Sequence, residues 1–188
     1  MENLIRLRQL MNQKSMDGLA IVPGPNLAYL TGSEFHLSER PVILFIRQED
    51  AIFVLPELEA PKIADLDIDF ISYNDRDGPG PAFAQFSQGN KFVGLGIESR
   101  LIRHLELDLI SSYNISSDII DATDLFAELR MSKSRIEIDH MRKAVETAER
   151  SLVSILDKMR PGVTEKQFAA ELVIQLLRNG SDTRLPFS

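Results

Sequence analysis

Six short runs rich in apolar residues occupy the first 121 residues, and they constrain the fold more than any other feature. The runs are GLAIV at 18–22, VILFI at 42–46, AIFVL at 51–55, DIDFISY at 67–73, KFVGLGI at 91–97 and NISSDII at 114–120. Runs of this length, bounded by Gly, Pro, Asn or Asp, are typical of strands. Helix-like segments separate most of them, and the polar RQED between the second and third runs predicts a hairpin. This alternation predicts an α/β domain, with helices packed around a mixed sheet.

The pattern changes after residue 121, because only helical periodicity continues from Asp124 to Asn179. Apolar residues recur every three or four positions along one stretch: Ile138, Met141, Val145, Ala148, Leu152, Ile155 and Met159. This spacing predicts one helix of about six turns with an apolar stripe, ended by Pro161 and Gly162.

Two capping boxes predict where the two helices of this region begin. Ser134 is followed three residues later by Glu137, and Thr164 is followed by Gln167. Both helices carry apolar faces that need a covering sheet or bundle, and the sequence offers only the start of one further strand. We therefore expect the chain to be a piece of a longer protein. The expected division is a domain at 1–122, a linker at 123–133, and the first helices of a truncated second domain at 134–188.

Composition excludes several classes of function. The 21 basic and 28 acidic residues give a net charge of -7, which disfavours binding to nucleic acid. No run of eighteen apolar residues exists, so no membrane span is expected. The chain has no cysteine, which rules out disulfides and thiolate metal sites and suits a cytoplasmic location.

Motifs that carry chemistry are weak in this sequence. Asp65, Asp67 and Asp69 imitate the start of a calcium loop, but the glycine and glutamate that such a loop needs are missing. Gly94 and Gly96 imitate a dinucleotide loop without its third glycine, and close packing of the backbone explains them equally well. No catalytic residue and no metal ligand is assigned from the residues alone.

Several segments taken together carry a family resemblance. The segments NLAYLTG at 26–32, ERPVILFI at 39–46, VLPELEAPK at 54–62 and VGLGIES at 93–99 resemble, in this order, the N-terminal domain of the creatinase/prolidase family. The segments DLFAELRMSKSRIEIDHMRKAVETAE at 124–149 and MRPGVTEKQFAAEL at 159–172 resemble the beginning of that family's catalytic "pita-bread" domain. The resemblance covers nearly the whole chain.

The resemblance implies a three-layer α/β N-terminal domain in a homodimeric Xaa-Pro metallopeptidase that acts on proline-containing peptides. In such peptidases two divalent metal ions (Mn, Co or Zn) activate a bridging water. The family's metal ligands and catalytic histidines follow the position of Ser188, so none is assigned here, and the 188 residues alone are expected to be inactive. Two alternatives stay open: a non-catalytic binding or scaffolding module, and a part of a creatinase-like amidinohydrolase.

The loop GSEFHLSER at 32–40 is the one candidate site within the chain. A metal site there is conceivable, but a solvated polar loop is the simpler interpretation. By resemblance, the N-terminal domain of one subunit approaches the active site of its partner, so the loop is a hypothetical substrate-access loop. In this hypothesis Arg40 binds a substrate carboxylate, Glu39 holds an ammonium group, and His36 tunes binding between about pH 5 and 8.

Overall fold

The computed structural model describes residues 2–182, and the chain forms two compact units, Met1–Met131 and Ser132–Ser188. Each unit is described separately below.

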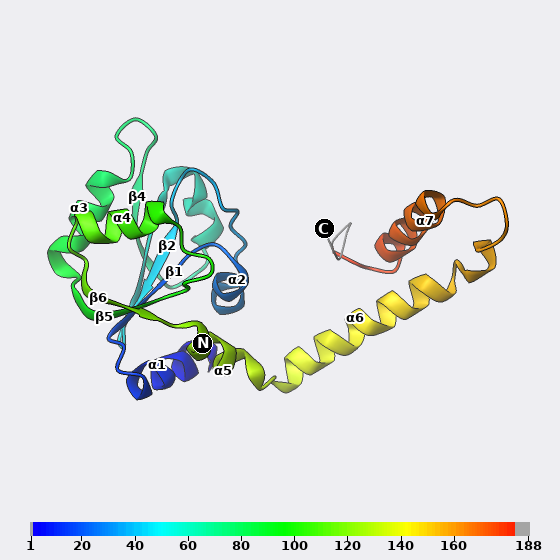
Figure 1. Cartoon of the computed structure of the whole chain (residues 1–188), viewed down its shortest axis with the longest axis horizontal. Helices are drawn as coiled ribbons and strands as arrows, with labels where there is room; N and C mark the ends of the chain where they lie inside the picture. The colour runs from blue at the N-terminus through cyan, green and yellow to red at the C-terminus, as the bar shows by residue number, and fades with distance from the viewer. Residues whose placement is uncertain (1, 183–188) are drawn as a thin grey trace. The chain divides into compact units, whose positions relative to one another are not determined.

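The first unit is built on a six-stranded mixed sheet of order β4-β3-β2-β1-β5-β6 (Figure 1). All six strands predicted from the sequence are confirmed. They are β1 (Gly18–Ile21), β2 (Ile43–Ile46), β3 (Ala51–Pro56), β4 (Asp69–Tyr73), β5 (Phe92–Ile97) and β6 (Ser116–Asp121). Strand β2 pairs antiparallel with both β1 and β3, and the other neighbouring strands pair parallel. The predicted hairpin joins β2 to β3, with Ile46 opposite Ala51.

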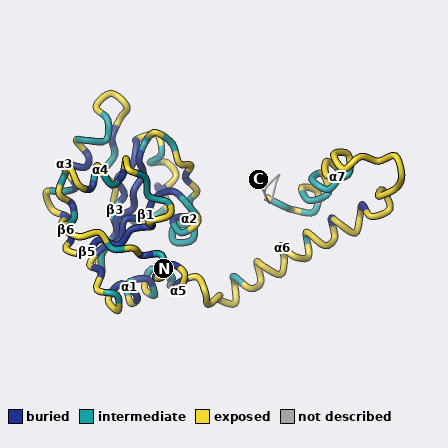
Figure 2. Tube along the Cα trace, viewed as in Figure 1, coloured by how far each residue is buried: buried dark blue, intermediate teal, exposed yellow. Residues whose placement is uncertain are grey.

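Helices cover both faces of this sheet, which confirms the predicted three-layer α/β architecture. They are α1 (Glu2–Gln13), α2 (Pro25–Thr31), the 3-10 helix η1 (Glu57–Ile63), α3 (Gly80–Gly89), α4 (His104–Ser112) and α5 (Thr123–Met131). Two apolar clusters fill the space between the sheet and the helices. One lies between one face of the sheet and helices α1, α2, η1 and α5, and the other lies between the opposite face and helices α3 and α4. The central strands β1 and β2 are buried along their whole length (Figure 2).

The glycines of β5 allow close packing of neighbouring side chains, which is the simpler of the two interpretations given above. A Cβ atom on Gly96 would lie 2.5 Å from Cδ2 of Leu19 and 2.7 Å from Sδ of Met16. Contacts this short do not occur between real side chains, so a larger residue here would force neighbouring side chains out of place. Gly96 therefore lets β5 pack against its neighbours and gives no support to a dinucleotide loop.

Residues 123–133 were expected to form a linker, but helix α5 (Thr123–Met131) in this segment belongs to the first unit. Leu125, Phe126 and Leu129 of α5 are buried in the core of the first unit, where α5 packs on α1. These apolar side chains share one helical face, so the helix covers the sheet instead of bridging two domains. The first unit accordingly extends to Met131.

The second unit consists of α6 (Arg135–Val153), the short 3-10 helix η2 (Leu156–Lys158) and α7 (Glu165–Arg178). Both predicted capping boxes are present, with Ser134 and Thr164 as the N-cap residues. Lys158 forms an ion pair of 2.7 Å with Glu171, and the Asn179 side chain donates a hydrogen bond of 3.0 Å to Ser151 Oγ. These contacts link the end of α6 and η2 to α7.

Helix α6 is shorter than the sequence predicts, because it ends at Val153 and not at Pro161. The hydroxyl of Ser151 donates to the carbonyl of Thr147 at 2.7 Å, and the hydroxyl of Ser154 donates to the carbonyl of Ser151 at 2.8 Å. Such local bonds to backbone carbonyls compete with the regular helical pattern. The apolar stripe of α6 is real but exposed within the described residues, as Figure 2 shows.

Candidate functional site

The loop that carries the predicted site residues lies at one edge of the sheet. It joins α2 to β2, and its last residues lie beside the carboxyl ends of β3 and β4, since β2 runs antiparallel to β3. His36 and Glu39 are exposed, and Arg40 is partly exposed. The carboxyl ends of parallel strands are the usual location of ligand sites in α/β proteins.

Arg40 is committed to ion pairs within the chain. Its Nε and Nη2 atoms donate to the two carboxylate oxygens of Asp75 at 2.7 and 2.8 Å, and its Nη1 atom donates to Glu39 at 2.7 Å. The hydrogen bond and charge of Asp75 raise the pKa of Arg40, and the same contact lowers the pKa of Asp75. A substrate carboxylate would have to displace Asp75 to use the planar fork of Arg40.

Two further side chains hold the same loop from behind. The hydroxyl of Tyr73 donates to the carbonyl of Pro41 at 2.8 Å, and burial raises the pKa of this hydroxyl, which keeps it protonated. Arg103 donates from Nη1 to the carbonyl of Ser38 at 2.5 Å. The buried carboxylate of Glu106 accepts from Arg103 Nε at 3.0 Å and fixes the guanidinium.

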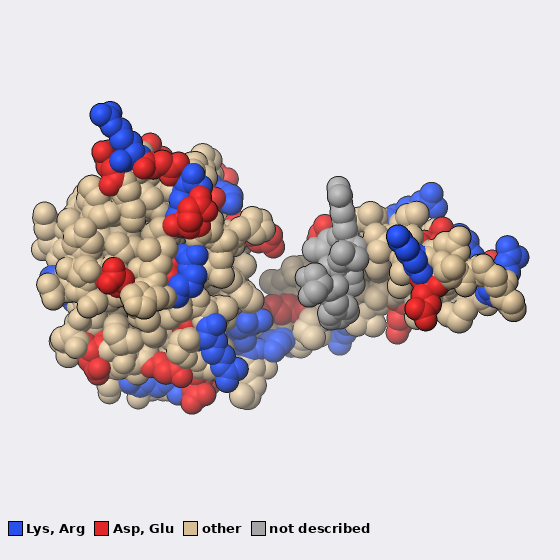
Figure 3. All heavy atoms as spheres, turned by 45° about the horizontal axis from the view of Figure 1, so that its top comes forward, with Lys and Arg blue, Asp and Glu red and all other residues tan. Residues whose placement is uncertain are grey.

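The sequence did not reveal these partners, because Asp75 lies 35 residues from Arg40, and Arg103 lies 65 residues from Ser38. The one available signal concerns Asp75, which lies two residues after Tyr73, the last residue of a predicted strand. Charged side chains are plentiful at this end of the first unit, where the turn after β4 projects (Figure 3).

A second polar cluster lies where the parallel strands β1 and β5 end. Glu98 is 4% exposed, and its carboxylate accepts hydrogen bonds from Asn26 Nδ2 at 2.7 Å and from the backbone N–H of Val22 at 3.3 Å. Arg130 donates to Asn26 Oδ1 at 3.1 Å. Burial raises the pKa of Glu98, although these hydrogen bonds and the charge of Arg130 oppose the shift. The cluster borders a pocket of about 250 Å³.

Replacing Glu98 by glutamine tests this raised pKa. A carboxyl whose pKa is raised in the folded state stabilises the fold in its protonated form. This contribution to the free energy of unfolding is fully present below the ordinary pKa of 4.5, and it is lost as the pH rises through the higher pKa of the folded state. We therefore expect the stability of the native chain relative to Glu98→Gln to be highest below about pH 4.5 and to fall as the pH rises above it. Urea unfolding followed by tyrosine fluorescence measures it, with Glu57→Gln as a control for net charge. A relative stability that does not change with pH would contradict the raised pKa.

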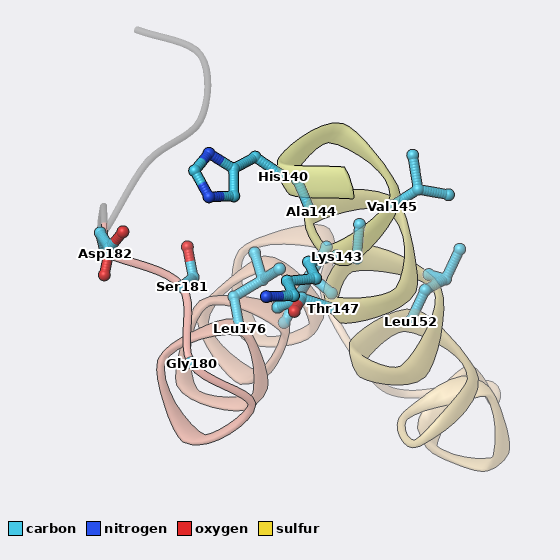
Figure 4. A pocket seen from close by; sticks show the side chains of 12 residues that line it. His140, Lys143, Ala144, Val145, Thr147, Leu152, Leu176, Gly180, Ser181 and Asp182 are labelled. Atoms are coloured by element: carbon cyan, nitrogen blue, oxygen red, sulfur yellow. The ribbon is translucent and has the colours of Figure 1, made fainter. Parts of the chain in front are cut away.

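A hollow of about 960 Å³ lies between α6 and α7 in the second unit (Figure 4). Its walls are mainly apolar, with side chains such as Val145, Leu152 and Leu176. His140 and Lys143 lie on the α6 side, and Asp182 lies on the segment after α7. The lining residues do not form an acid–base pair. The mainly apolar lining is typical of a helix face that packs against other protein.

Metal binding has no support within residues 2–182. No group of three or more His, Asp or Glu side chains in this range is arranged to hold a metal ion. Asp65, Asp67 and Asp69 are exposed or partly exposed between η1 and the start of β4. In the same range no helix is both long and apolar enough to cross a membrane.

Comparisons with known proteins match the chain almost from end to end. The sequence model described as "Creatinase/Prolidase N-terminal domain" matches residues 4–132. The Xaa-Pro dipeptidase of Pyrococcus horikoshii is 25% identical over 187 residues, which are 96% of this chain and 49% of that protein. The probable dipeptidase PepE of Mycobacterium bovis is 30% identical over 169 residues, which are 87% of this chain and 44% of that protein.

A solved structure gives the same result for the fold. The crystal structure of dipeptidase PepE from Mycobacterium ulcerans has a TM-score of 0.79 and 26% identity, and the match covers 95% of this chain and 49% of that one. The chain thus spans about half the length of the curated relatives it matches.

Proposed function

The chain belongs to the creatinase/prolidase family, and from this membership we propose that it is the N-terminal part of an Xaa-Pro peptidase. The observation that carries the proposal is the extent of the match, which includes the second unit as well as the N-terminal domain. Relatives named Xaa-Pro dipeptidase and probable dipeptidase align over 96% and 87% of this chain. A binding module that consists of the N-terminal domain alone would not include α6 and α7.

In this proposal the two units have different tasks. The first unit, with its own core, shapes access to the substrate and contributes to a homodimer. The second unit begins the catalytic domain, and the exposed apolar side chains of α6 and α7 pack against the rest of that domain. In this proposal, as the family resemblance implies, the metal ions are held by residues outside the described part of the chain. The reaction is hydrolysis of the peptide bond before proline, with cytoplasmic peptides as the substrates.

The loop at 32–40 is proposed to face the substrate. Of the three residues first considered, His36 is the most available, because Arg40 and Glu39 pair with each other and Arg40 pairs also with Asp75. A neutral imidazole has one nitrogen that donates a hydrogen bond and one that accepts, which suits either end of a short peptide. Arg40 and Glu39 can bind a substrate only when the substrate replaces their present ion-pair partners.

Activity of the whole protein compared with that of the 188 residues tests the function. We expect the whole protein, loaded with Mn²⁺ or Co²⁺, to hydrolyse Xaa-Pro dipeptides and to leave matched dipeptides without proline intact. The 188 residues alone should show no turnover, and calorimetry should detect no tight metal site in them. Hydrolysis of creatine instead would establish the amidinohydrolase alternative. A whole protein without either activity would support the non-catalytic module, and turnover by the 188 residues alone would contradict the proposal.

A further inference from the structure

The loop at 32–40 and the adjacent Pro41 are held by contacts at both ends. The first half of the loop is fixed by contacts with η1 and β3. The Ser33 hydroxyl donates to the carbonyl of Lys62 at 2.9 Å. The Phe35 side chain points into the core, with its ring centroid 5.8 Å from that of Phe53. The Lys62 ammonium lies 5.2 Å from the centroid of the same Phe35 ring, a distance typical of cation–π contacts.

The second half is fixed by three contacts that reach it from β4, the turn after β4 and the start of α4. These are the bonds from Tyr73 to Pro41, from Arg103 to Ser38 and between Asp75 and Arg40. The contacts from Tyr73 and Arg103 end on backbone carbonyls. The contact between Asp75 and Arg40 is an ion pair, and both of its side chains are at least partly exposed. The Asp75 contact is therefore the one that solvent, salt or a ligand can most readily reach.

Between the two anchored halves, two neighbouring side chains project outward. His36 is exposed and Leu37 is 48% exposed. Within the described part of the chain His36 makes no hydrogen bond. A large apolar side chain and a hydrogen-bonding ring are thus presented side by side on a loop that is held on both sides.

We propose that Asp75 is a positioning residue, which anchors the loop through Arg40 so that His36 and Leu37 form the contact surface for a short peptide. The inference rests on the proposed function, and it gives Arg40 an internal role where the sequence suggested direct binding of the substrate. A bidentate carboxylate–guanidinium pair suits this task, because it fixes direction as well as distance. Preorganisation of this kind lowers the entropic cost of binding a flexible peptide.

Order in the loop is the first measurement, made on the 188-residue chain by backbone ¹⁵N relaxation. In the native chain we expect order parameters near about 0.8 for residues 36–39, and in Asp75→Asn we expect values below about 0.6. Asp75→Glu keeps the carboxylate and should restore most of the order. Asp69→Asn at the start of β4 is the matched control, because Asp69 forms no ion pair with any described residue. Unchanged order in Asp75→Asn would overturn the anchor.

Kinetics of the whole protein supply the second measurement. Asp75→Asn should raise KM for Xaa-Pro dipeptides about two- to fivefold with kcat unchanged, as expected for loss of one exposed ion pair that acts before chemistry. Asp75→Glu should recover most of this change, and Asp69→Asn should have none. A loosened loop with native KM would overturn the positioning role and leave the peptidase proposal standing. A whole protein without peptidase activity would overturn the proposed function and this role together, while the relaxation data still decide the anchor.

Discussion

Replacing Phe45 by alanine is expected to lower the free energy of unfolding of the first unit by about 3–5 kcal/mol. Phe45 lies on β2 and is 1% exposed. Its ring centroid lies 4.2 Å from that of Phe86, 6.1 Å from that of Phe92 and 6.4 Å from that of Phe83. Removal of the ring takes away these contacts and leaves a cavity between the sheet and α3, which the surrounding side chains fill only in part.

Urea unfolding measures this loss, and the sequence provides a convenient probe. The chain has no tryptophan and three tyrosines, Tyr29, Tyr73 and Tyr113, all of which lie in the first unit. Tyrosine fluorescence therefore reports the unfolding of that unit alone. Phe70→Ala on β4 is the matched control, because its ring is 50% exposed and its removal should cost little. A loss below about 1 kcal/mol for Phe45→Ala would show that the aromatic cluster is not the centre of the core.

The sheet was predictable from the sequence because the signals that define strands are local. Runs such as GLAIV and VILFI end at turn-forming residues, so all six strands were found within a few residues of their observed bounds. The capping boxes at Ser134 and Thr164 were equally local, since each depends on two residues three positions apart. Features of this kind need no knowledge of the tertiary structure.

Features that depend on tertiary contacts could not be predicted from the sequence. The segment at 123–131 has a weak apolar face and looked like a linker until the structure showed its side chains in the core against α1. The Asp75–Arg40 pair joins residues 35 positions apart, so nothing nearby in the sequence of Arg40 marks it as occupied. For the same reason the sequence suggests a free guanidinium at Arg40, although Asp75 occupies it in the structure.

The second prediction with a large effect concerns the independence of the two units. Residues 1–131 are expected to fold alone and to unfold in one cooperative transition, because both apolar clusters of the sheet are complete within that unit. The tyrosine-detected urea transition of residues 1–131 should coincide with that of the whole chain. A shift of the midpoint to lower urea by the removal of residues 132–188 would show that the second unit stabilises the first.

Residues 132–188, in contrast, are expected to lose most of their helix when separated from other protein. Apolar side chains of α6 such as Ile136, Met141 and Val145 are 69%, 56% and 55% exposed, so little burial stabilises the two helices. Helices of 19 and 14 residues are marginal in water without a packed face. Circular dichroism at 222 nm should show less than about a third helix, rising steeply in trifluoroethanol. A cooperative thermal transition of this peptide would instead mean that α6 and α7 stabilise each other, and that their exposed faces need no further domain to cover them.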